Sequence, residues 1–92
     1  MEKTLTPKTK KRIHPTDALA SQYPEVEGEN GMWKYEIEAV DGYCFDSIFF
    51  INSIAHGKAH CQMVADNIRA NTKLSGNAWL LRLDNTEIPF QV

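Results

Sequence analysis

Cysteine is scarce in this sequence, which has 92 residues and only two cysteines. Two cysteines are too few for the disulfide framework of a small secreted domain, so we expect free thiols in a reducing compartment. Long apolar runs are lacking as well. No stretch approaches the roughly 18 apolar residues of a membrane-spanning helix, and no apolar segment of a secretory signal follows the charged N-terminus. We therefore expect a cytoplasmic protein with no membrane partner.

The motifs that usually carry catalysis are also missing. The sequence has no nucleophile elbow and no glycine-rich loop to cradle phosphate. It has no pair of carboxylates obviously placed for acid–base chemistry, and a Cys44 nucleophile would need His60 brought to it by the fold. We expect a protein that is not an enzyme and that uses no cofactor.

A strong net charge is absent too, since the formal total is −2. The distribution is nevertheless uneven. Residues 1–14 contain five basic residues and one acidic residue. Residues 15–46 contain one basic and eight acidic residues, and residues 47–92 contain four basic and three acidic residues. The chain therefore has a basic start, an acidic middle and a mixed second half.

Residues 1–31 are rich in Pro, Lys, Glu, Thr and Gly and poor in large apolar residues. Such a composition buries too little surface to offset the entropy of ordering, so we expect an extended arm. One helical turn is expected within residues 15–23, before Pro24. If the arm is ordered, we expect Leu19 and Tyr23 to contact the rest of the protein.

Two strands and a turn are expected next. From residue 32, apolar Trp33, Tyr35, Ile37 and Ala39 alternate with charged residues, as in a half-buried antiparallel strand. Asp41-Gly42 is a favoured two-residue hairpin turn. The following strand, residues 43–51, is so apolar that we expect it to be central or partly covered on both faces. Asp46 interrupts it, as an edge-protecting charge, a bulge residue or a contact residue.

A helix of about 16–20 residues is expected from Ile54, with Asn52 or Ser53 as its cap and residues 75–77 marking its end. Gly57 lies on its apolar face, where it permits close approach to the sheet. Two short strands, residues 78–83 and 87–92, complete the chain, and Pro89 places the last one at an edge. We therefore expect an α+β domain at residues 32–92, a four-stranded antiparallel sheet with one amphipathic helix packed on one face (ββαββ), preceded by the extended arm of residues 1–31.

The stretch "IAHGKAHC" (residues 54–61) suggests metal chemistry. With Cys44 it gives Cys44, His56, His60 and Cys61, and these residue types suit zinc. Helical projection separates them, however, because it directs Cys61 to the core and leaves the two histidines at the helix rim as surface residues. A zinc-binding structural module is therefore the less favoured alternative, and no metal site is predicted.

A second alternative is a small nucleic-acid-binding or regulatory protein that uses its basic arm. Cations in such an arm can neutralise phosphates without reading sequence. The sheet lacks the basic and aromatic signature of an RNA-recognition fold, and the polar face of its first strand is mostly acidic. This composition favours phosphate contacts by the arm over contacts by the sheet.

The basic arm "MEKTLTPKTKKR", the acidic "EVEGENG" and the hairpin "MWKYEIEAVDGYCFDSIFF" together resemble the small phage-encoded anti-CRISPR proteins. The resemblance is one of size and character, and no diagnostic motif carries it. It implies a stoichiometric inhibitor, in the host cytoplasm, of a type I CRISPR surveillance complex. Such an inhibitor docks on the backbone or DNA-binding subunits, sometimes reaching the guide RNA, and blocks hybridisation or binding of target DNA.

The partner expected from these features is a protein or ribonucleoprotein complex. Three groups of charged residues are the candidate contacts: arm cations for RNA phosphate, acids for the Lys and Arg residues that hold DNA, and cations on the outer helix face. They are Lys8, Lys10, Lys11 and Arg12, then Glu25, Glu27, Glu29, Glu36 and Glu38, and finally Lys58, Arg69 and Lys73.

Overall fold

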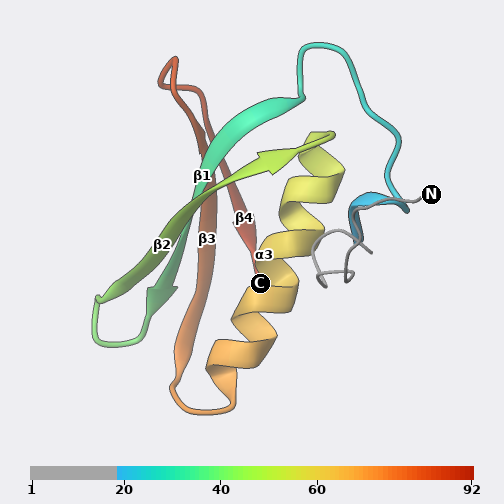
Figure 1. Cartoon of the computed structure of the whole chain (residues 1–92). Helices are drawn as coiled ribbons and strands as arrows, with labels where there is room; N and C mark the ends of the chain where they lie inside the picture. Colours follow the sequence, from blue (N-terminus) through green and yellow to red (C-terminus); the bar gives the residue numbers. More distant parts are fainter. Residues whose placement is uncertain (1–18) are drawn as a thin grey trace, which may run out of the picture.

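The computed structural model describes residues 19–92, which form a four-stranded antiparallel sheet with one helix packed on it (Figure 1). The elements follow the order β1 (Gly31–Ala39), β2 (Cys44–Ile51), α3 (Ile54–Arg69), β3 (Leu74–Arg82) and β4 (Glu87–Gln91). In the sheet the strands lie in the order β2-β1-β3-β4. The α+β class and the ββαββ order predicted from the sequence are confirmed.

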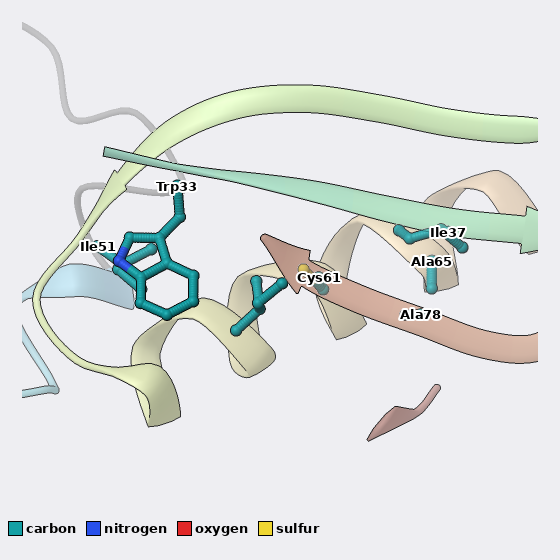
Figure 2. Close-up of a cluster of buried hydrophobic side chains, with 7 residues drawn as sticks. Trp33, Ile37, Ile51, Cys61, Ala65 and Ala78 are labelled. Carbon is teal, nitrogen blue, oxygen red and sulfur yellow. The ribbon is translucent and has the colours of Figure 1, made fainter. Parts of the chain in front are cut away.

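Within residues 19–92, one face of the sheet is covered by α3 and the other carries no helix, and we name this second face the open face. Because side chains alternate along a strand, the odd-numbered residues of β1 point to α3 and the even-numbered ones to the open face. The core between sheet and helix contains Trp33 and Ile37 from β1, together with Cys61 and Ala65 from α3 (Figure 2). The apolar residues of the alternating pattern predicted for β1 are thus the ones that face the core.

Gly57 brings α3 unusually close to the sheet. A Cβ atom at this position would lie 2.8 Å from Leu80 Cδ1 and 3.1 Å from Ile51 Cδ1, and both neighbours are fully buried. The predicted close approach is confirmed. At the start of the helix, Ser53 is the cap and its Oγ accepts a hydrogen bond from the His56 N–H at 3.2 Å.

The helix ends at Arg69, earlier than residues 75–77 suggested. Those residues belong to β3, because the Ala39–Leu74 pairing extends the central ladder toward the helix. Gly76 has a φ of +97°, and the β1–β3 register shifts between Ile37 and Ala39. A Ser-Gly-Asn sequence read as a helix stop therefore marks an irregularity inside a strand.

The second strand is not central, which corrects the prediction made from its apolar composition. Among the described strands β2 pairs only with β1 and forms one edge of the sheet, and β3 occupies the other side of β1. The turn before β2 also differs, since Gly42 N donates to Ala39 O and Ala39 N donates to Tyr43 O. This is a three-residue loop with glycine at the positive-φ bulge position. β4, with Pro89, forms the opposite edge as predicted.

The described part of the arm lies against the start of α3. The Asn52 side-chain amide donates to the carbonyls of Ala20 at 3.1 Å and Tyr23 at 3.0 Å. The Tyr23 ring stacks on the His56 ring, with centroids 5.8 Å apart. The expected contact through Tyr23 is therefore present, and Leu19 is half-buried. Over residues 19–92, no helix is long and apolar enough to span a membrane.

Candidate protein-binding surface

Three large apolar side chains are exposed together on the open face, beside the β2 edge. Met32 is 48% exposed, Ile48 60% and Phe50 54%. Met32 lies opposite Phe50 in the ladder, and Ile48 lies opposite Lys34 one row along. We name these three residues the apolar patch. Contiguous exposed apolar side chains bordered by polar ones are characteristic of interaction sites.

A small ion-paired group lies next to the apolar patch. Lys34 Nζ lies 3.1 Å from Glu36 Oε2 and 3.4 Å from Asp46 Oδ2, and the two acidic residues are directly opposite in the β1–β2 ladder. The hydrogen bond and charge of Glu36, followed by those of Asp46, raise the pKa of Lys34. Two like charges opposite each other are unfavourable, so Lys34 compensates the pair. Asp46 lies on an edge strand, where an edge-protecting charge was one expectation, but its pairing with Lys34 reduces that protection.

The open face as a whole is acidic. The register places Glu36 and Glu38 of β1, Asp46 of β2 and Glu87 of β4 on this face, and Lys34 is the one cation that the four described strands add to it. Glu38 Oε1 accepts hydrogen bonds from Ser75 Oγ and Asn77 Nδ2, each at 3.1 Å. Two of the predicted acidic contacts, Glu36 and Glu38, thus share one exposed surface with the apolar patch.

The other predicted acids lie in the loop before β1. Glu25 accepts a hydrogen bond from the Asn30 side chain, and Glu29 Oε1 accepts one from Ile54 N–H at 3.1 Å, at the first residue of α3. These bonds give the two carboxylates a structural role. Glu27 is exposed, so it is the loop acid best placed for a partner.

The cations predicted on the helix do not form one surface. Lys58 Nζ lies 5.7 Å from the centroid of the Phe90 ring, whereas Arg69 pairs with Asp66 at 3.3 Å. At 1.5 Å per residue the two cations are separated by about 16 Å along the helix axis. Lys73 is exposed in the turn before β3. Lys8, Lys10, Lys11 and Arg12 lie outside the described residues.

Both histidines are buried, so their predicted position at an exposed rim is wrong. His56 is 3% exposed and His60 7%. His56 Nδ1 accepts a hydrogen bond from Asn52 N–H at 2.9 Å, and burial lowers the pKa of this imidazole. Tyr23 covers His56 and Phe49 covers His60. Helical projection predicts burial only on the side of the helix that faces the sheet. It does not predict burial by side chains that reach the helix from a loop or an edge strand, as Tyr23 and Phe49 do here.

The cysteines and histidines do not form a zinc site. Cys61 is fully buried between α3 and the sheet, and burial raises the pKa of its thiol to about 12. Cys44 is exposed, and its pairing with Glu38 puts it on the open face. Within residues 19–92, no three His, Cys, Asp or Glu side chains are grouped as metal ligands.

A groove between β2 and the C-terminal half of α3 was not expected from the sequence. Its volume is about 410 Å³, and it is mainly apolar. Its lining residues are Phe45, Val64, Asn67, Ile68, Asn71 and Thr72. The half-buried Phe45, Val64 and Ile68 were predicted as strand and core residues, and only the edge position of β2 leaves them partly uncovered. We name this feature the β2–α3 groove.

Comparison of the chain with protein-family models, with curated protein sequences and with solved structures gives no match in any of the three. The assignment of function therefore depends on the surfaces described above.

Proposed function

We propose that this protein is a non-enzymatic binding protein that docks through the open face on a basic protein surface of a nucleoprotein complex. The observation that carries the proposal is the apolar patch lying beside an excess of carboxylates on one uncovered sheet face. Apolar contact supplies affinity and charge complementarity supplies specificity and fast association. Lys and Arg side chains that normally hold nucleic acid are the cations such a face would meet.

The resemblance to anti-CRISPR proteins makes a type I surveillance complex the candidate partner. On such a complex, Glu36 and Glu38 would occupy cations needed for target DNA, and Glu27 would extend the acidic contact. Lys8, Lys10, Lys11 and Arg12 would reach guide-RNA phosphates. Docking of this kind would place the protein in the host cytoplasm and block DNA hybridisation or binding stoichiometrically.

The open face is a poor surface for direct contact with nucleic acid. Exposed aromatic side chains such as Phe50 can stack on bases, but single-strand-binding surfaces also need cations along the phosphate path. Here the carboxylates of this face would repel phosphate. In this proposal the sheet binds protein, and only the arm contacts RNA.

The test measures binding of the full chain to a purified type I surveillance complex from the natural host. The double variant Glu36→Lys/Glu38→Lys should bind at least tenfold more weakly and lose inhibition of DNA hybridisation. Asp66→Lys, a single charge reversal at an exposed position of α3, is the control and should bind normally. Unchanged affinity of the folded double variant would contradict docking through the open face. Full inhibition by substoichiometric protein would contradict the binding mechanism.

A further inference from the structure

The two edges of the sheet are protected to very different degrees. Sheet edges that stay free are usually short or carry proline or lysine, which prevent another strand from pairing. β4 has five residues and contains Pro89, whereas β2 has eight residues and contains neither proline nor lysine. Its one charged residue, Asp46, is partly compensated by Lys34. β2 is therefore the edge that an added strand can pair with.

The ladder geometry identifies the backbone groups that β2 offers. Ala39 N–H donates to Tyr43 O at 2.7 Å, which fixes the hydrogen-bonded rows between β1 and β2. Because these rows alternate in an antiparallel pair, Phe45, Ser47 and Phe49 direct their N–H and C=O groups toward β1. The intervening residues direct theirs away from the sheet. These are Cys44, Asp46, Ile48 and Phe50.

The β2–α3 groove lies beside this edge on the covered side. Phe45 of β2 lines it together with Val64 and Ile68 of α3, and Asn67 and Asn71 add amide groups. Side chains of a strand added to β2 would alternate between the open face and the groove. A groove of about 410 Å³ is in the range of roughly 300–1,000 Å³ that small-ligand pockets occupy. It has room for a large apolar side chain.

We propose that an extended, basic segment of a partner protein adds as a strand to β2 and inserts an apolar side chain into the β2–α3 groove. In this mode the backbone hydrogen bonds supply affinity, and the groove selects the side chain. The basic character follows from charge, because residues 19–92 carry ten acidic residues against five basic ones. A second copy that paired through its own β2 would place its Asp46 and its acidic open face beside those of the first copy, and it is electrostatically less suitable. The inference rests on the proposed function, since it names a second contact with that protein partner.

A first experiment uses a synthetic twelve-residue peptide of alternating lysine and valine, blocked at both ends, with the full chain. We expect the peptide to bind and to slow exchange of the amide hydrogens of Cys44, Asp46, Ile48 and Phe50. The matched glutamate–valine peptide should bind at least tenfold more weakly. Failure of the lysine–valine peptide to protect these amides would overturn the proposal. Dimerisation of the protein alone through the same amides would overturn it in favour of a second copy.

Variants separate the backbone contact from the side-chain contact. Ile48→Pro removes an outward N–H, while Ile48→Ala retains it, so proline should weaken peptide binding at least tenfold relative to alanine. Asn67→Trp should block the groove and weaken binding, whereas Asp66→Trp, one residue away and outside the groove, should not. If the proline variant fails to fold, the test depends on Asn67→Trp. An unchanged affinity of that variant for the peptide would then contradict the proposal.

The same variants distinguish this inference from the proposed function when the surveillance complex is the ligand. Loss of affinity in Glu36→Lys/Glu38→Lys with no loss in Asn67→Trp would support open-face docking and overturn strand addition. Full affinity in Glu36→Lys/Glu38→Lys, with loss in Asn67→Trp and weaker binding of Ile48→Pro than of Ile48→Ala, would overturn open-face docking and support strand addition, because Ile48 itself belongs to the apolar patch. Full affinity in all three would overturn both.

Discussion

The ring of Phe49, on the edge strand β2, stacks on the ring of His60 in α3, with centroids 4.2 Å apart and planes 25° from parallel. This contact joins the outermost strand to the helix and shields an imidazole that the sequence pattern placed at the surface. Tyr35 of β1 lies against the same imidazole at 5.7 Å. The edge strand that offers a binding site is thus anchored to the core by an aromatic contact.

The first prediction concerns this pair. A double-mutant cycle of Phe49→Ala and His60→Ala should give a coupling of about 0.5–1.5 kcal/mol, the usual value for stacked rings beyond their buried area. Unfolding in urea, followed by circular dichroism, measures it. Phe90→Ala with His60→Ala, a pair with no ring contact between its members, serves as the control. Additive effects for Phe49 and His60 would show that the stacking is energetically unimportant.

The second prediction concerns Gly57. Alanine is favoured over glycine in a helix by about 1 kcal/mol, but its Cβ would lie 2.8 Å from Leu80 Cδ1. Overpacking of this kind costs roughly 1–3 kcal/mol. We expect Gly57→Ala to lower the melting temperature, and Leu80→Val in the same chain to restore part of the loss. A higher melting temperature for Gly57→Ala would mean that the core adapts to the extra methyl group.

The third prediction concerns pH. Burial lowers the pKa of His56, so below the ordinary value near 6.5 the unfolded chain binds a proton that the folded chain does not. Above pH 6.5 the neutral His56 contributes a constant amount to the free energy of unfolding. As the pH falls through 6.5, protonation of the unfolded chain lowers the free energy of unfolding. Urea titrations at pH 7.5 and 5.5 measure the change. His56→Asn, whose side-chain oxygen can accept from the Asn52 N–H, should show a smaller decrease.

The fourth prediction concerns thiol reactivity. Cys44 is exposed, whereas Cys61 is fully buried and its pKa is raised to about 12. A thiol-specific reagent at pH 8 should therefore modify one cysteine of the folded protein rapidly and the second only after unfolding. Cys44→Ser should abolish the rapid phase. Rapid reaction in that variant would show that α3 opens readily from the sheet.

The fifth prediction concerns the arm. Replacing Lys8, Lys10, Lys11 and Arg12 with alanine should weaken binding to the surveillance complex and flatten its dependence on salt. Each lost contact with a single-stranded phosphate should reduce the slope of log K against log salt by about 0.7. Asp66→Asn, which removes a charge at an exposed position of α3 outside both proposed contacts, should not flatten the slope. An unchanged affinity and slope would assign no binding role to these four cations.

Local patterns in the sequence predict the fold well where a strict period is present. The alternation from Trp33 to Ala39 gives both the strand and its buried face, and the helical period around Cys61 gives the core face of α3. The position of β2 was missed because an aromatic-rich strand has the same composition whether both faces are covered or an edge is exposed. That position depends on β3 pairing with β1, a contact between residues far apart in the chain.

The candidate binding surfaces were predictable only in part for the same reason. Glu36 and Glu38 follow from strand alternation, but the exposure of Ile48 and Phe50 requires the strand order. The β2–α3 groove requires in addition the position at which the helix passes the edge strand. Even His56 and His60, which stand out in the sequence, were misplaced because the side chains that cover them come from distant segments.

Pro89 has a consequence for the size of any assembly. Arg82 N–H donates to Thr86 O, so the alternating rows place Pro89 among the β4 residues whose backbone faces away from β3. At that central outward position β4 has no N–H to donate. The sheet is therefore extensible from one side only. Growth into a fibre by alternating β2-to-β4 contacts is therefore disfavoured.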